Sequence, residues 1–105
     1  MDPATAHERR DELVLLDVRE GDEWRAGHIP GSLHIPMGEL QARLDEVPRD
    51  RLIVTVCRVG QRSAAVATAL DRAGYEVENL VGGVAEWKGV GLPLVDPNGD
   101  EGTVA

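Results

Sequence analysis

A single cysteine, Cys57, lies at the end of an apolar, β-branched run and is followed by a short loop with two arginines and one glycine. The run 52–57 is typical of a buried strand, and the alanine-rich segment from Ser63 is typical of a helix. The amino end of a helix presents unpaired N–H groups and a positive dipole end, so a loop that enters it can surround an anion. A thiol in such a place has a lowered pKa. The sequence therefore predicts that Cys57 is a nucleophile in an anion-binding loop.

The alternative is that Cys57 only fills the core, because a lone cysteine at a strand end is commonly a small buried hydrophobe. The residues that follow favour chemistry instead. Arg58, Gly60 and Arg62 are poor choices for filling a core and good choices for holding an anion. From this loop alone, the functional interpretation is modestly favoured over packing.

Composition limits the classes of protein that fit. The chain of 105 residues is expected to form one domain, and its net charge of −8 argues against a nucleic-acid or anionic membrane surface. One cysteine cannot form an internal disulfide, which suits a reducing compartment. No stretch approaches the length of a membrane span and no leader is evident, so we expect a soluble, cytoplasmic protein.

Strand-like and helix-like segments alternate along the chain. Strands are expected over residues 13–18, 32–36, 52–57 and 76–80, and helices over 3–11, 21–26, 39–47, 63–73 and 84–88. This alternation predicts an α/β fold with a mainly parallel sheet and helices on both faces. We expect one domain over residues 1–95, followed by a flexible acidic tail over 96–105.

Ligands of parallel sheets bind beyond the carboxyl ends of the strands. Cys57 lies at one such end, and Asp17 and Arg19 follow the first strand at another. For these two charged residues we favour structural support over chemistry, with the Asp17 carboxylate bonding neighbouring loops and Arg19 pairing with an acidic side chain. No metal or organic cofactor is expected, because the histidines are scattered in sequence at His7, His28 and His34.

Three sequence blocks occur in order between residues 13 and 87. The first comprises Leu16-Asp17-Val18-Arg19, Glu23-Trp24, Gly27-His28-Ile29-Pro30-Gly31-Ser32 and His34-Ile35-Pro36; the second is Cys57-x-x-Gly60-x-Arg62-Ser63; the third is Leu80-x-Gly82-Gly83-x-x-x-Trp87. Together they closely resemble the single-domain rhodaneses, the thiosulfate sulfurtransferase-like proteins. Relatives often carry an additional strand and helix ahead of the first block. Here only about a dozen residues precede it, so that edge of the sheet is expected to be abbreviated.

The resemblance implies a rhodanese-like fold and a sulfurtransferase that carries a sulfane sulfur as a persulfide on Cys57. It implies that this sulfur is held by the main-chain amides of the loop, which comprises Arg58, Val59, Gly60, Gln61, Arg62 and Ser63. Arg58 would bind the thiosulfate dianion, which favours thiosulfate over mercaptopyruvate, and Arg62 would close the loop and stabilise the anion. The acceptor would be cyanide in an assay, or a thiol such as glutathione, thioredoxin or a partner protein.

Three other functions remain open at this point. A persulfide carrier or binding module would serve a partner protein with little thiosulfate turnover of its own. A phosphatase or arsenate reductase needs the longer spacing Cys-x₅-Arg, and here that position is Ser63, with Arg62 one residue short. A peroxide-sensing thiol would exploit the same low pKa, since an exposed thiolate is readily oxidised.

Overall fold

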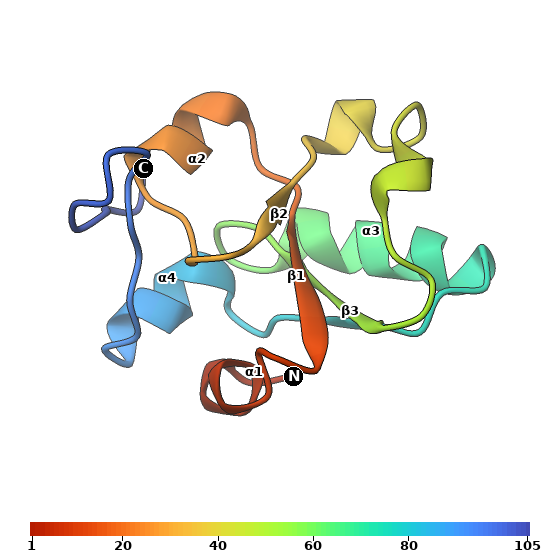
Figure 1. Cartoon of the computed structure of the whole chain (residues 1–105), viewed down its shortest axis with the longest axis horizontal. Coiled ribbons are helices and arrows are strands. Elements are labelled where there is room, and N and C mark those ends of the chain that lie inside the picture. Colours follow the sequence, from red (N-terminus) through yellow and green to blue (C-terminus); the bar gives the residue numbers. More distant parts are fainter.

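The centre of the molecule is a sheet of four parallel strands (Figure 1). The computed structural model describes all of residues 1–105. The strands are β1 (Leu13–Asp17), β2 (Leu33–His34), β3 (Leu52–Val56) and β4 (Val77–Asn79), in the spatial order β2-β1-β3-β4. The expected α/β class with a parallel sheet is confirmed, and β1 and β3, which carry the two candidate strand ends, are direct neighbours.

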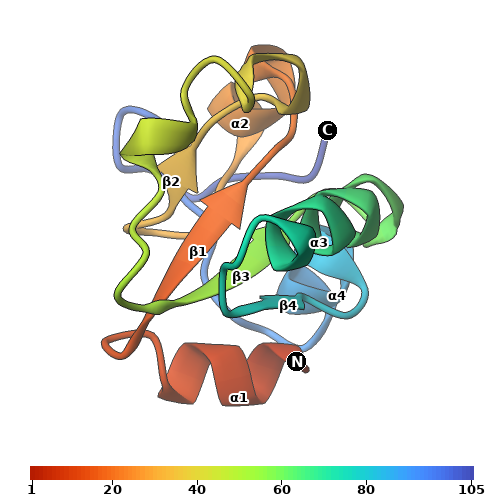
Figure 2. The same cartoon turned by 90° about the vertical axis from the view of Figure 1, so that its right-hand side faces the viewer.

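Helices cover both faces of this sheet. The helices are α1 (Pro3–Glu8), α2 (Gly21–Ala26), α3 (Gln61–Arg72) and α4 (Gly83–Gly89), with two short 3₁₀ turns, η1 (Met37–Glu39) and η2 (Leu44–Glu46). Side chains of α1 and α4 belong to one buried cluster, and side chains of α3 belong to the other, so the sheet lies between them (Figure 2). None of these helices combines the length and the apolar character that crossing a membrane requires.

The two buried clusters explain why the strand sequences are continuously apolar. Leu13 and Leu15 of β1 point into the cluster with α1 and α4, whereas Leu16 points into the cluster with α3. On β3, Val54 and Ile53 are divided between the clusters in the same way. Because successive strand residues point to opposite faces, a strand that is buried on both faces needs an apolar side chain at every position.

The expected helix over 39–47 is wrong: the segment consists of the turns η1 and η2. It lies between Pro36 and Pro48, and helices this short gain too little from their own hydrogen bonds to be stable, whereas 3₁₀ turns serve as connectors. The apolar spacing still has its expected result, because Leu40 and Val47 are both buried. The pattern identified the buried positions correctly but not the type of helix.

Residues 96–105, which we expected to form a flexible tail, instead fold back against the domain. Thr103 N–H donates to the Ala26 carbonyl over 2.8 Å, at the end of α2. A Cβ atom on Gly27 would lie 2.4 Å from the Thr103 oxygen, and one on Gly102 would lie 2.6 Å from the Gly27 Cα. Two glycines thus allow close contact between backbones that are far apart in sequence.

The outer edge of β4 is occupied by Met1 alone. The main-chain nitrogen of Met1 donates to the Asn79 carbonyl over 2.8 Å, and its carbonyl accepts from Val81 N–H over 2.9 Å. A single residue therefore pairs with this edge of the sheet.

Candidate active site

The loop between β3 and α3 is held from outside by the amino end of α4. Val84 N–H donates to the Cys57 carbonyl over 2.9 Å, and Ala85 N–H donates to the Arg58 carbonyl over 3.0 Å. A Cβ on Gly83, whose φ is +60°, would lie 2.3 Å from the Cys57 oxygen, so only glycine allows α4 to come this close. In a trans peptide the carbonyl and the next N–H point in opposite directions. The following loop amides therefore face away from α4.

The Cys57 sulfur lies inside the turn that these contacts produce. Gly60 N–H points at the sulfur over 3.1 Å, Ser63 N–H over 3.4 Å and the Ser63 hydroxyl over 3.2 Å. Gly60 makes the turn possible with a φ of +103°, in the left-handed region, directly before the first residue of α3. The sulfur therefore has three hydrogen-bond donors around it at the amino end of a helix.

Two opposed effects decide the charge of this thiol. Burial of Cys57 raises the pKa of its thiol, because the thiolate loses hydration. Hydrogen bonds from the Ser63 hydroxyl and from the N–H groups of Ser63, Gly60 and Val59 outweigh this effect, so the pKa lies below its ordinary value. The direction agrees with the prediction from sequence, and the main cause that lowers the pKa is the set of donors aimed at the sulfur.

Arg62 is paired with an acidic side chain of α2. Its guanidinium forms two parallel hydrogen bonds to the Glu23 carboxylate, both 2.8 Å long. The hydrogen bond from Arg62 lowers the pKa of Glu23 to about 2, against the smaller opposing effect of burial. The resemblance implied that Arg62 closes the loop and stabilises its anion; in the structure its guanidinium is paired with Glu23. Arg62 therefore ties α3 to α2 and closes the loop from behind.

This pair gives a pH dependence with a definite sign. A carboxylate whose pKa is lowered by folding stabilises the protein above its unfolded pKa of 4.5, and this contribution is lost as the pH falls towards about 2. Glu23→Gln is expected to lower the free energy of unfolding at pH 6 by about 1 kcal/mol, a value reduced for the solvent exposure of Arg62. The variant should also lose less stability than the parent between pH 6 and pH 3. Urea unfolding at both values measures this, with Glu12→Gln in the exposed pair with Arg9 as the control; equal pH dependence in parent and Glu23→Gln would contradict it.

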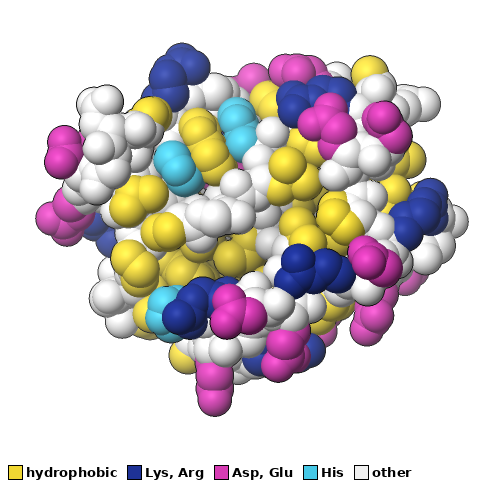
Figure 3. Space-filling model, in the orientation of Figure 1, with side chains coloured by type: hydrophobic (Ala, Val, Ile, Leu, Met, Phe, Trp, Pro, Cys, Tyr) yellow, Lys and Arg dark blue, Asp and Glu magenta, His cyan; other side chains and the backbone are white.

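Arg58 is the loop arginine that pairs with no Asp or Glu side chain. Its side chain is exposed, and its Nε donates to the main-chain oxygen of Ala105 over 2.9 Å. Val59 and Gln61 are exposed beside it, with half of Val59 open to solvent. Across the face seen in Figure 3, basic and acidic side chains are interspersed, without an extended basic area. The guanidinium at the mouth of the loop is therefore paired with a main-chain oxygen and not with an Asp or Glu side chain.

Asp17 and Arg19 form an ion pair that is fully buried at the end of β1. Arg19 Nη2 lies 2.8 Å from the Asp17 carboxylate, and both residues have no exposed surface. The same guanidinium donates to the carbonyls of Gly27 over 2.8 Å and Glu23 over 3.3 Å. The pair therefore fixes α2 and the turn after it against the sheet, which in turn places Glu23 opposite Arg62. This geometry fits the structural support expected of both residues.

Sequence reasoning missed Asn79 and Thr55. Asn79 ends β4, next to β3, and its side chain bonds both to the Ser63 hydroxyl and to the Gly60 carbonyl. Thr55 is buried inside β3, and its hydroxyl donates to the Ser63 carbonyl over 2.9 Å. Both carried a signal in the sequence: a polar residue inside an apolar strand, and an amide at the carboxyl end of the next strand.

The histidines are used for packing on the tryptophans. His28 and His34 lie parallel to the Trp24 ring, with centroid distances of 3.6 and 4.6 Å. His7 meets Trp87 edge to face at 5.6 Å. No group of three or more His, Cys, Asp and Glu side chains is placed to hold a metal ion.

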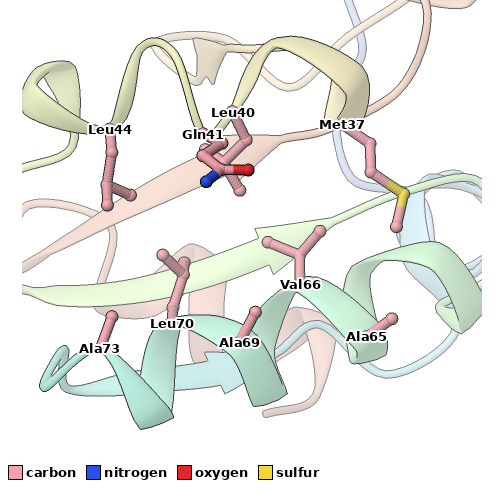
Figure 4. A pocket seen from close by; sticks show the side chains of 9 residues that line it. All are labelled: Met37, Leu40, Gln41, Leu44, Ala65, Val66, Ala69, Leu70 and Ala73. Atoms are coloured by element: carbon pink, nitrogen blue, oxygen red, sulfur yellow. The ribbon is translucent and has the colours of Figure 1, made fainter.

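An apolar groove of about 290 Å³ lies between α3 and the turns η1 and η2. Met37 and Ala65 are at one end and Leu44 and Ala73 at the other, and Gln41 is the one lining residue that is not hydrophobic (Figure 4). A ligand site normally combines an apolar lining with several converging polar groups. The groove lacks these groups and its lining includes no nucleophile, so the loop of Cys57 is the better candidate for chemistry.

Comparison with known proteins gives consistent matches. The family model described as the rhodanese-like domain matches residues 2–89. A sulfurtransferase of Allochromatium vinosum is 40% identical over 90 residues, which cover 85% of this chain and 84% of the relative. A thiosulfate sulfurtransferase of Coxiella burnetii is 32% identical over 81 residues, covering 76% of each chain.

A solved structure gives the same result for the fold. The crystal structure of a rhodanese-related protein from Thermoplasma volcanium superposes with a TM-score of 0.87 at 33% identity. The match covers 90% of this chain and 95% of the other. The overall fold therefore occurs in a protein of nearly the same extent.

Proposed function

Because the chain belongs to the family of rhodanese-like domains, we propose that it transfers a sulfane sulfur through a persulfide on Cys57. The observation that carries the proposal is the set of three donor groups within hydrogen-bond distance of one sulfur atom: the N–H groups of Gly60 and Ser63 and the Ser63 hydroxyl. Donors so arranged stabilise negative charge on the sulfur without having to reorganise during the reaction. The thiolate is the form of cysteine that attacks an electrophilic sulfur.

The proposed reaction is a double displacement with thiosulfate as the donor. The Cys57 thiolate attacks the outer sulfur of thiosulfate, a new S–S bond forms, the S–S bond of thiosulfate breaks, and sulfite leaves with the electron pair. The outer sulfur of the persulfide is then attacked by a thiolate or by cyanide. This second step returns the Cys57 thiolate and requires no oxidant, metal or organic cofactor.

Arg58 is proposed to bind the thiosulfate dianion at the mouth of the loop. Arg58→Ala should lower kcat/KM for thiosulfate by about 10- to 150-fold, because a charge-assisted hydrogen bond contributes about 1.5–3 kcal/mol. The melting temperature should stay within about 2 °C, since this side chain is exposed. The control is Arg72→Ala, an exposed arginine in the last turn of α3. An unchanged kcat/KM in Arg58→Ala would remove Arg58 from the substrate site.

A persulfide carrier is the second candidate. The single cysteine fits this role, because the sulfur must leave for an external acceptor. A carrier would take its sulfur from a protein persulfide and pass it to a partner protein, glutathione or thioredoxin. The phosphatase alternative is weakened, because the arginine that would hold a phosphate is already paired with Glu23.

One experiment distinguishes the two candidates. The rate of Cys57 persulfide formation is measured in single turnover, once with thiosulfate and once with the persulfide of a cysteine desulfurase as donor. Loading by thiosulfate at a rate that supports steady-state thiocyanate formation is the expected result. Slow loading by thiosulfate together with fast loading by the protein persulfide would establish the carrier instead.

A further inference from the structure

The side chain of Asn79 joins two points of the loop around the sulfur. Its Nδ2 donates to the Gly60 carbonyl over 3.0 Å, and its Oδ1 accepts from the Ser63 hydroxyl over 2.5 Å. The direction of both bonds is fixed by chemistry, because a carbonyl can only accept. The arm of the amide that faces Gly60 must be the nitrogen, so the arm that faces Ser63 is the oxygen.

The Ser63 hydroxyl, which has one hydrogen to donate, therefore lies within hydrogen-bond distance of two acceptors. Its hydroxyl oxygen lies 2.5 Å from Asn79 Oδ1 and 3.2 Å from the Cys57 sulfur. A serine hydroxyl has a single O–H donor, so it cannot serve both acceptors at once. The neighbouring Thr55 hydroxyl does not relieve this competition, because its nearest acceptor is the Ser63 carbonyl at 2.9 Å and Asn79 Oδ1 lies 3.3 Å away.

We propose that Asn79 is a positioning residue, which competes with the Cys57 sulfur for the single hydroxyl proton of Ser63. While Cys57 is a neutral thiol, the Ser63 hydroxyl donates its hydrogen bond to Asn79 Oδ1. When Cys57 becomes a thiolate, the hydroxyl rotates and donates to the sulfur. The amide of Asn79 thus determines how much stabilisation the thiolate receives from Ser63.

For sulfur transfer, this inference rests on the proposed function. Thiosulfate and the Cys57 thiolate yield a persulfide and sulfite, and the negative charge moves from the cysteine sulfur to the outer sulfur. The cysteine sulfur is then no longer charged, so the Ser63 hydroxyl turns back and donates to Asn79 Oδ1. Asn79 therefore stabilises the thiol and the persulfide relative to the thiolate, and it favours the loaded form of the protein.

Asn79 also acts in the opposite direction through Gly60. Its Nδ2 holds the Gly60 carbonyl and so keeps Gly60 N–H aimed at the sulfur. Loss of this contact raises the pKa of Cys57. Loss of the competing acceptor Asn79 Oδ1 lowers it, because the Ser63 hydroxyl is then free to donate to the sulfur. A single variant mixes the two effects, and a double-mutant cycle with Ser63→Ala separates them, because only the second effect passes through the Ser63 hydroxyl.

The test measures the pKa of Cys57 from the pH dependence of its alkylation by iodoacetamide. The four proteins are the parent, Asn79→Ala, Ser63→Ala and the double variant, with Asn98→Ala in an exposed turn as the control. Asn79→Ala changes the pKa of Cys57, and this change should be about half a pH unit more negative in the parent than in the Ser63→Ala background. That difference corresponds to a fraction of the free energy of one charged hydrogen bond. A merely structural Asn79 would give the same shift in both backgrounds.

The proposal would be overturned if Asn79→Ala changed the pKa of Cys57 equally in the two backgrounds, or if the change were more positive with Ser63 present. If Asn79→Ala does not fold, Asn79→Ser takes its place in the cycle, because it shortens the side chain but keeps a polar group at this half-buried position. Alkylation needs no sulfur donor, so its outcome does not depend on the proposed function. Failure of thiosulfate to load the parent protein would overturn the sulfurtransferase and leave the result of the cycle intact.

Discussion

Cys57→Ser is expected to fold normally and to lose sulfur transfer by at least about a thousandfold, the scale of removing a covalent nucleophile. A serine hydroxyl fits the place of the thiol, and the N–H groups of Gly60 and Ser63 can donate to its oxygen as they do to the sulfur. The hydroxyl remains protonated at neutral pH and forms no persulfide. The measurement is thiocyanate formation from thiosulfate and cyanide, together with the free energy of unfolding.

Ser63→Ala is the matched comparison for this variant. It keeps the nucleophile but removes the hydroxyl that lowers the pKa of Cys57. We therefore expect a partial loss of the sulfur-transfer rate at neutral pH. The rate should recover as the pH rises, because more of Cys57 is then thiolate. Retained activity in Cys57→Ser would show that the transferred sulfur is not carried by this residue. The chain has no other cysteine to take its place.

Asp17→Ala is expected to lower the free energy of unfolding by about 3–5 kcal/mol, the usual cost of leaving one partner of a buried ion pair alone. Without the carboxylate, Arg19 keeps only the carbonyls of Gly27 and Glu23 as partners, in a site with no exposed surface. Urea unfolding followed by tryptophan fluorescence gives the value. For a small domain, this loss is a large part of the total stability.

The double variant Asp17→Ala/Arg19→Met separates charge from packing. Removing both charges leaves no unpaired ion, so the double variant should be more stable than Asp17→Ala alone. A loss below about 1 kcal/mol in Asp17→Ala would show that the pair does not hold α2 against the sheet. The observed placement of Glu23 opposite Arg62 would then need a cause other than the Asp17–Arg19 pair.

Features that depend on neighbours in sequence could be predicted. The continuously apolar runs identified the buried strands β1 and β3. The position of Cys57 at a strand end, directly before a helix, was sufficient to predict the direction of its pKa shift. These are local properties of the chain, and periodicity and residue type report them.

Features that depend on distant neighbours could not be predicted. Nothing in the sequence shows that Glu23 pairs with Arg62, because the meeting of α2 and α3 depends on the buried pair after β1. Asn79 reaches the loop only because β4 lies beside β3. In each case the partner is fixed by the packing of the sheet and not by spacing along the chain.

The role of Cys57 is tested most directly by the mass of the intact protein after brief incubation with thiosulfate, and again after addition of cyanide. The account predicts that the parent gains the mass of one sulfur atom, that this gain is absent in Cys57→Ser, and that cyanide removes it. A parent protein that gains no sulfur from thiosulfate, while its thiol reacts normally with iodoacetamide, would contradict thiosulfate as the donor.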